Sequence, residues 1–108
     1  MKGGRRGAAA FAVLAMVAMT ACEREPRRHV VEIGAMAYEP AALEVAMGDT
    51  VAWSNGDVVP HTVTFANGES DADHLDRGDT LEIVAREAGT VQYRCRYHPS
   101  MVATLIVR

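Results

Sequence analysis

The sequence predicts an all-β sandwich of seven or so short strands, preceded by an export signal. From residue 30 onward, short runs rich in β-branched and aromatic residues alternate with Gly, Asn, Asp and Pro turn signals. No stretch after residue 22 keeps helical periodicity over two full turns. Regularly spaced short strands without helices are typical of a two-sheet sandwich. A domain this small buries only about 60–65% of its unfolded surface, so a metal ion that joins distant segments would add stability.

The first residues have the order of a secretory signal peptide. Lys2, Arg5 and Arg6 form a basic start, and an apolar run of 12 residues follows at 8–19. This run is shorter than the ~20 residues that a membrane-spanning helix needs. An uncleaved start-transfer anchor is the alternative interpretation.

The signal ends in Met19-Thr20-Ala21-Cys22, which resembles the lipobox of bacterial lipoproteins. In that pattern a peptidase cuts just before a cysteine that carries a diacylglyceryl group, although Met19 stands where Leu is usual. We therefore expect residues 1–21 to be removed and Cys22 to be lipidated. Several acyl chains on one cysteine would hold the protein on its membrane, in the periplasm or at the cell envelope.

The charge of the mature chain excludes one class of function. Cleavage after residue 21 removes three of the 11 basic residues and none of the 14 acidic ones, so the formal charge changes from −3 to −6. The remaining bases are all arginines. Phosphate binding depends on clustered Lys and Arg, so we expect no binding to nucleic acid.

A short charged segment separates the signal from the predicted domain. Residues 22–29 contain a proline and alternate acidic and basic side chains, as a tether does. His29 lies in this segment and is expected to be a solvated linker histidine. The folded domain is then predicted to cover residues 30–108.

The first half of the domain contains four expected strands. Gly48-Asp49 separates two of them, and Asn55-Gly56-Asp57 is a strong turn signal before the last. The expected strands in this half are 30–36, 43–47, 50–55 and 61–65.

The second half begins with a polar loop at 67–79 and ends in three expected strands. The loop is rich in Asp, Glu and Gly, and Glu87-Ala88-Gly89 marks a later turn. The expected strands in this half are 80–85, 90–95 and 102–108.

Three potential metal ligands lie close together near the carboxyl end. Cys95, His98 and Met101 offer a thiolate, an imidazole and a thioether, each separated from the next by two residues. A tight loop of this length can turn all three side chains toward one centre. Soft and borderline ligands of this kind suit copper, whose blue sites use two histidines, one cysteine and a long axial methionine.

A second histidine must come from elsewhere in the chain. His61 opens a β-branched strand directly after Pro60, so its position is expected to be rigid. His74 is the competitor, but it lies in the acidic loop and would have to be ordered before it could bind. Because a pre-organised ligand loses less entropy on binding, the interpretation favours His61.

Only two cysteines are present, and each has a simpler interpretation. Cys22 and Cys95 could form a disulfide in an exported protein. Cys95 could also be an inert buried thiol, and Met101 could be ordinary core packing. The joint spacing of the candidate ligands favours the metal site over these alternatives.

Two long segments of the chain resemble the cupredoxin, or blue copper, family. Residues 38–65 are similar to the family pattern of an aromatic residue, Pro, Val, Gly-Asp, Val-x-Trp, Asn and His-x-Val. Residues 88–107 are similar to its last two strands, with the Cys-x₂-His-x₂-Met ligand loop of amicyanin length. Together these segments cover most of residues 30–108.

The resemblance implies a Greek-key sandwich of seven to eight strands with one copper ion at one end. It implies that His61, Cys95 and His98 form a trigonal plane and that Met101 is a weak axial ligand. It also implies a monomer that exchanges single electrons with a protein redox partner, with His98 as the exposed electron port.

Two departures from the family pattern affect the ligand loop. Thr62 stands where many members have Asn after the first histidine, and its hydroxyl is expected to do less than the amide. Tyr97 stands where close relatives often have Pro. Both differences affect the reduction potential and the stiffness of the loop.

Other functions remain as alternatives to electron transfer. A periplasmic copper carrier or sensor could use the same ligands, and a metal-free sandwich lipoprotein could keep the fold alone. A copper reductase would need a second copper site with further histidines. The remaining histidines, His29 and His74, are not expected to form such a site, so no enzyme activity is expected. Zinc could also occupy the ligands in vitro.

Overall fold

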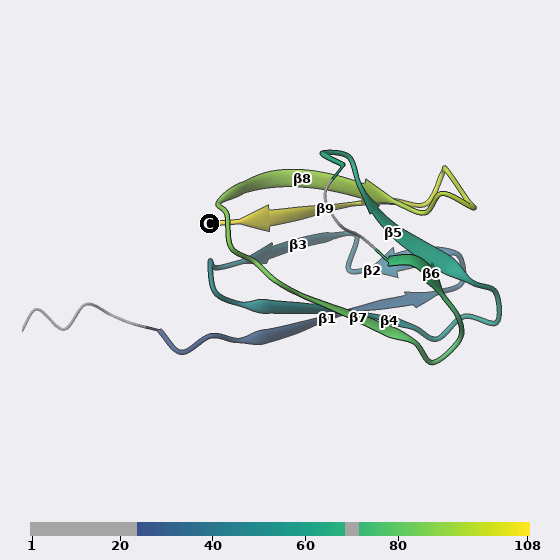
Figure 1. The fold of residues 1–108 in the computed structure, drawn as a ribbon, viewed down its shortest axis with the longest axis horizontal. Helices are drawn as coiled ribbons and strands as arrows, with labels where there is room; N and C mark the ends of the chain where they lie inside the picture. Colours follow the sequence, from purple (N-terminus) through teal and green to yellow (C-terminus); the bar gives the residue numbers. More distant parts are fainter. Residues whose placement is uncertain (1–23, 69–71) are drawn as a thin grey trace, which may run out of the picture.

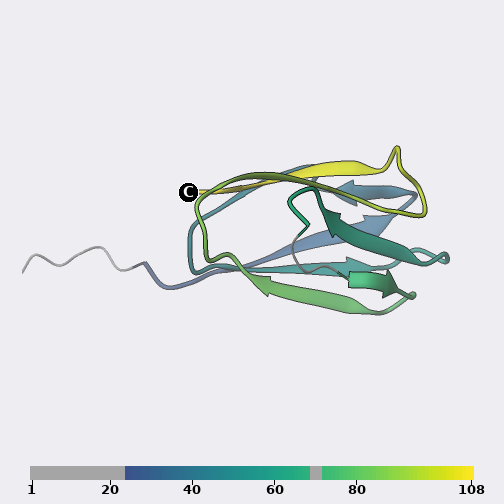
Figure 2. The same cartoon turned by 45° about the horizontal axis from the view of Figure 1, so that its top comes forward.

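The computed structural model describes residues 24–68 and 72–108. The predicted signal peptide and the predicted lipidation site, Cys22, lie outside the described residues. Two facing layers of strands are visible in Figures 1 and 2, and the described residues contain no helix. The nine strands are β1 (Arg28–Gly34), β2 (Ala37–Glu39), β3 (Ala42–Val45), β4 (Thr50–Asn55), β5 (His61–Phe65), β6 (Ala72–Leu75), β7 (Thr80–Val84), β8 (Gly89–Arg94) and β9 (Val102–Val107).

The strands form two mixed sheets. One sheet has the order β2-β1-β4-β7 and the other the order β3-β9-β8-β5-β6. The pairs β1–β4 and β3–β9 are parallel, and the other pairs are antiparallel. The predicted all-β sandwich is therefore confirmed, with all seven expected strands present and their ends shifted by up to two residues.

Two short strands were not predicted. β2 follows β1 through a tight turn, and β6 lies inside the segment expected to be a polar loop. β6 pairs with β5 only at two registered positions, because a bulge interrupts the ladder between His61 and Val63. A strand of four residues with this composition carries little alternation, so its sequence gives no strand signal.

The space between the sheets is filled by aromatic side chains. Tyr38, Trp53, Phe65 and Tyr93 are all buried, and their rings meet edge to face or tilted at centroid distances of 4.8–5.7 Å. Such contacts add specific geometry to the hydrophobic burial. The two sheets are thereby held together beneath the candidate site.

The segment before residue 30 is bound to the sandwich by a buried carboxylate. Asp49 accepts hydrogen bonds from the Arg27 backbone N–H at 2.9 Å, from His29 Nε2 at 2.9 Å and from the Arg24 guanidinium at 2.8 Å. The interpretation of His29 as a solvated linker residue was therefore wrong. The residue belongs to β1, and its ring is bonded to the buried Asp49 carboxylate. Sequence patterns missed this contact because it joins residues 20 positions apart.

The described residues contain no helix that is long and apolar enough to span a membrane.

Candidate metal centre

Strand pairing brings the three candidate ligands of the trigonal plane together at one end of the sandwich. His61 is the first residue of β5, and Cys95 directly follows β8. β5 and β8 are neighbours in one sheet, with Thr64 opposite Arg94. The start of β5 therefore lies beside the end of β8, and the loop that leaves β8 returns His98 to the same place.

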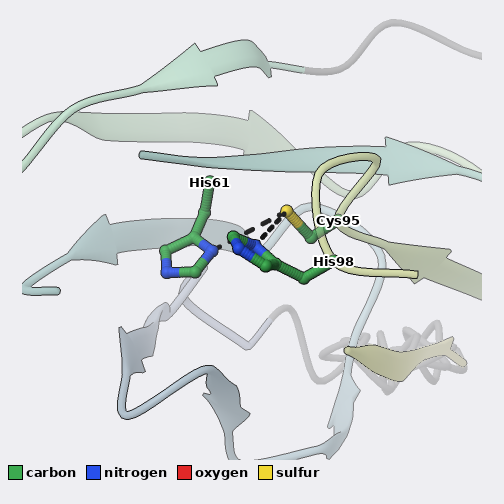
Figure 3. Close-up of side chains that lie close together, drawn as sticks. All are labelled: His61, Cys95 and His98. Atoms are coloured by element: carbon green, nitrogen blue, oxygen red, sulfur yellow. Dashed lines mark hydrogen bonds between the residues drawn. The ribbon is translucent and has the colours of Figure 1, made fainter. Parts of the chain in front are cut away.

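The ligand atoms of His61, Cys95 and His98 face one another (Figure 3). The Cys95 sulfur lies 3.7 Å from Nδ1 of His61 and 3.7 Å from Nδ1 of His98. All three atoms lie within 4.8 Å of one another. Cys95 and His61 are fully buried, whereas His98 is half-buried.

These distances fit a metal ion in the plane of the three atoms. With bonds as long as those of zinc, ~2.3 Å to sulfur and ~2.0 Å to nitrogen, ligands set 120° apart would be separated by ~3.7 Å. The donor set of one thiolate and two imidazoles is the one that blue copper sites use. The side chains therefore fit copper in both geometry and chemistry.

Asp57 orients the first histidine. Its carboxylate accepts a hydrogen bond from Nε2 of His61 at 2.9 Å, which leaves the Nδ1 lone pair facing Cys95. This hydrogen bond is the main cause that holds the pKa of Asp57 below its ordinary value of 3.8. The same carboxylate accepts the N–H of Met36 at 3.1 Å.

The turn that presents Met36 is strained. Ala35 and Met36 have φ angles of 49° and 63°, in the left-handed region that side chains other than glycine avoid. A two-residue hairpin turn of this hand normally carries Asn and Gly. The bond from Met36 to Asp57 helps to hold this turn against the loop that ends in His61.

Thr62 connects β5 with the loop that contains Cys95, on the buried side of the site. Its N–H points at the Cys95 sulfur at 3.3 Å, and its hydroxyl oxygen accepts the N–H of Arg96 at 2.8 Å. Its carbonyl accepts the buried hydroxyl of Tyr38 at 2.5 Å. The Thr62 hydroxyl, which was expected to do less than an amide, makes the cross-loop bond itself.

The Cys95 thiol is poised to lose its proton. Burial raises its pKa, but the N–H groups of Thr62 and Tyr97 and the polar contacts with the His61 and His98 rings together outweigh burial and lower the pKa from 9.0 to about 6. The thiolate is the form that binds a metal. Cys95 is a free thiol in the described part of the chain, so no disulfide competes for it there.

The loop from Cys95 to Met101 is closed by two backbone hydrogen bonds. Cys95 N–H donates to the Met101 carbonyl at 3.1 Å, and Met101 N–H donates to the His98 carbonyl at 2.9 Å. The Met101 side chain is buried within the core cluster. The methionine therefore lies beneath the loop and is not displayed at the surface.

His74, the alternative histidine, does not join this group. Its ring is half exposed and is bound to Tyr97 and Asp76. The structure thus brings His61 beside Cys95 and leaves His74 at the outer side of the loop. Asp57 is the residue that sequence reasoning missed, because it was assigned only to a turn. A carboxylate four residues before a candidate histidine ligand was the available signal.

A copper-binding β-sandwich is the class that this fold and this donor set define. Residues 27–108 match the family described as copper binding proteins, plastocyanin/azurin family. The chain therefore belongs to the plastocyanin/azurin family, and copper is its cofactor.

Amicyanins are among the similar curated proteins. Amicyanin of Paracoccus denitrificans is 35% identical over 83 residues, which cover 72% of this chain and 63% of that protein. Amicyanin-alpha of Methylorubrum extorquens is 30% identical over 104 residues, which cover 91% of this chain and 87% of that protein. The chain thus spans 63% of the length of the two Paracoccus amicyanins that it matches.

Solved cupredoxin structures share the fold. A purple cupredoxin from Nitrosopumilus maritimus superposes with a TM-score of 0.68 at 32% identity, covering 74% of this chain and 99% of its own. Amicyanin from Paracoccus versutus superposes with a TM-score of 0.69 at 34% identity, covering 75% and 81%. These likenesses agree with the sandwich predicted from the sequence.

Proposed function

We propose that this blue copper protein carries single electrons between redox partners at the cell envelope. His61, Cys95, His98 and Met101 would hold one copper ion, with the Met101 thioether as the weakest donor. The observation that carries this proposal is the pair of equal 3.7 Å separations between the Cys95 sulfur and the two imidazole nitrogens, inside a largely buried site. When bound, copper supplies a Cu(II)/Cu(I) couple for outer-sphere electron transfer.

The protein contributes a ligand frame that resists movement. His61 is held by β5 and Asp57, and Cys95 is held by β8 and Thr62. Ligands fixed by a sheet and by hydrogen bonds move little when the charge at the site changes. A small rearrangement of this kind lowers the barrier to electron transfer.

The proposed electron port is His98. Its imidazole is half-buried, whereas that of His61 is fully buried. The half-buried ring would connect the site with a docked partner, which the buried His61 ring cannot do. A protein redox partner would therefore approach the end of the sandwich that carries the β8–β9 loop.

Hydrogen bonds to the sulfur would set the reduction potential. Thr62 N–H and Tyr97 N–H both donate to Cys95. Such bonds draw negative charge from the thiolate, which favours the reduced form of the site. The weak thioether of Met101 would act in the same direction.

Lipidation of Cys22 remains part of the proposal. It is supported by the lipobox-like end of the signal at residues 19–22. The mature protein would be a monomer anchored to its membrane through this cysteine, with residues 1–21 removed and the domain in the periplasm or at the cell envelope. Mass spectrometry of the amino-terminal peptide would show the lipid on Cys22, and an unmodified cysteine would contradict it.

The optical spectrum of the copper-loaded protein tests the function. A trigonal thiolate–copper site is expected to give an intense band near ~600 nm, and Cys95→Ser should abolish it. Rapid electron exchange with a small cytochrome would support a carrier of electrons. A blue protein that exchanges electrons with no partner would instead support copper carriage or sensing.

A further inference from the structure

The ligand loop has a side-chain contact on its outer surface that the proposed copper ligands do not explain. Tyr97, between Cys95 and His98, is 46% exposed, and its hydroxyl lies 2.9 Å from Nδ1 of His74. Nε2 of the same histidine lies 2.8 Å from Oδ1 of Asp76. We call Tyr97, His74 and Asp76 the outer clamp.

The proton positions in the outer clamp follow from its acceptor. Asp76 is a carboxylate and accepts, so Nε2 of His74 donates to it. In the uncharged form of the ring, Nδ1 then carries a lone pair that accepts the Tyr97 hydroxyl. The two rings also meet edge to face at 5.8 Å. The phenol is therefore held in both direction and distance.

His74 and Asp76 of the outer clamp are held in place by the sandwich. His74 lies on β6, and the next residue, Leu75, is buried and registers with His61 on β5. The buried Asn55 side chain donates to the Leu75 carbonyl at 2.8 Å. Asp76 is fixed in turn by its N–H, which donates to Asp79 at 2.8 Å.

We propose that His74 is a positioning residue for the copper site and holds the ligand loop through Tyr97. This inference rests on the proposed ligand set. Thr62 holds the loop from inside through Arg96 N–H, and His74 holds the adjacent residue from outside. Tyr97 stands where, as noted from the sequence, relatives often have proline. A proline restricts the backbone, and a tyrosine does not. The anchored phenol replaces that restriction.

Loss of the outer clamp should loosen the loop without unfolding the sandwich. Tyr97→Phe removes one exposed hydroxyl, and His74→Leu removes its acceptor, so both variants should keep the urea midpoint of the metal-free protein. Copper should be lost to a chelator about three to ten times faster, the factor expected for one lost hydrogen bond. The Tyr97→Phe/His74→Leu double variant should be no faster than either single variant.

Electron self-exchange provides a readout that a purely structural contact would not move. A looser loop rearranges more between oxidation states, so self-exchange of both single variants should be slower than that of the wild type. His74→Asn keeps a carbonyl acceptor near the Nδ1 position and should restore most of the wild-type behaviour. Arg86→Gln, an exposed substitution beyond β7, serves as the control and should leave both rates unchanged.

The results separate this inference from the ligand assignment. Wild-type chelation and self-exchange rates in Tyr97→Phe and His74→Leu, in a protein that is blue, would overturn the outer clamp alone. Additive effects in the double variant would overturn it as well, because the two residues would then act separately. A wild type that stays colourless after copper loading would overturn the ligand set and, with it, this inference.

Discussion

At the residue scale, His61 depends on one carboxylate for its orientation. Asp57 accepts a hydrogen bond from Nε2 of His61, so the other ring nitrogen faces the Cys95 sulfur. Loss of a hydrogen-bond partner that orients a metal ligand commonly changes metal affinity by 10–100-fold. The residue is therefore as much part of the site as a ligand, although it does not contact the metal position.

We expect Asp57→Ala to weaken copper binding by roughly 10- to 100-fold, because the His61 ring loses its fixed tautomer and direction. Asp57→Asn keeps an oxygen acceptor and should lose less. Competition with a chelator of known affinity measures both variants. Affinities equal to that of the wild type would show that β5 alone orients the ring.

Thr62 offers a second test at this scale. Thr62→Val preserves shape but removes the hydroxyl that accepts the Arg96 N–H, which should cost about 0.5–1.5 kcal/mol of unfolding free energy in the metal-free protein. Thr62→Ser keeps the hydroxyl and should stay closer to the wild type. Urea denaturation gives the comparison, and equal midpoints for Val and wild type would argue against the cross-loop bond.

At the scale of elements, the amino-terminal segment and β1 are joined to the rest of the sheet through Asp49. The Arg27 N–H and the His29 ring are the largest causes that hold the pKa of Asp49 well below its ordinary value of 3.8. A carboxylate with a lowered folded pKa stabilises the fold above its unfolded pKa. That stabilisation is lost as the pH falls from about 4 toward the folded value.

Asp49→Asn should therefore destabilise the protein at pH 6, and the difference from the wild type should shrink as the pH falls from 5 to 2. The asparagine is neutral at every pH, whereas in the wild type the unfolded chain takes up a proton at Asp49 over this range while the folded carboxylate stays ionised. Urea midpoints of the metal-free proteins at each pH test this expectation. A constant difference across the range would mean that the charge of Asp49 is not responsible.

β6 shows how an element can be specified by its neighbours and not by its own residues. Its side chains give no alternation of their own, but β5 offers it a partner edge, and Asn55 binds the carbonyl of its last residue, Leu75. Only this placement brings His74 beside the ligand loop. The predicted polar loop was therefore wrong for these four residues because the pairing is a tertiary contact.

At the scale of the whole molecule, the segment at Arg24 and the metal centre lie at opposite ends. The segment at Arg24 meets Asp49 just before β4 begins, whereas β4 ends at Asn55, near the loop that leads to His61. Figure 1 shows the chain entering at one end of the sandwich and the β8–β9 loop at the other. With Cys22 lipidated, the copper end would face away from the membrane.

Vesicle-bound lipidated protein should then react with hexacyanoferrate, which stays in water, at about the same rate as the soluble Cys22→Ala variant. The reason is that His98 would remain open to solvent in both forms. Stopped-flow decay of the blue band measures the two rates. A marked slowing on vesicles would mean that the copper end lies against the lipid.

Strand alternation and ligand spacing were enough to predict the sandwich and the ligand loop at 95–101, and to favour His61 over His74. Alternation along a strand and short ligand spacing are local patterns, so they can be recognised without knowledge of the partner strand. Three contacts could be seen only in the folded chain: Asp57 with His61, His29 with Asp49, and His74 with Tyr97. Each of these contacts depends on how a turn or a strand edge is placed in space, and the residues involved carry no periodic signal that records that placement.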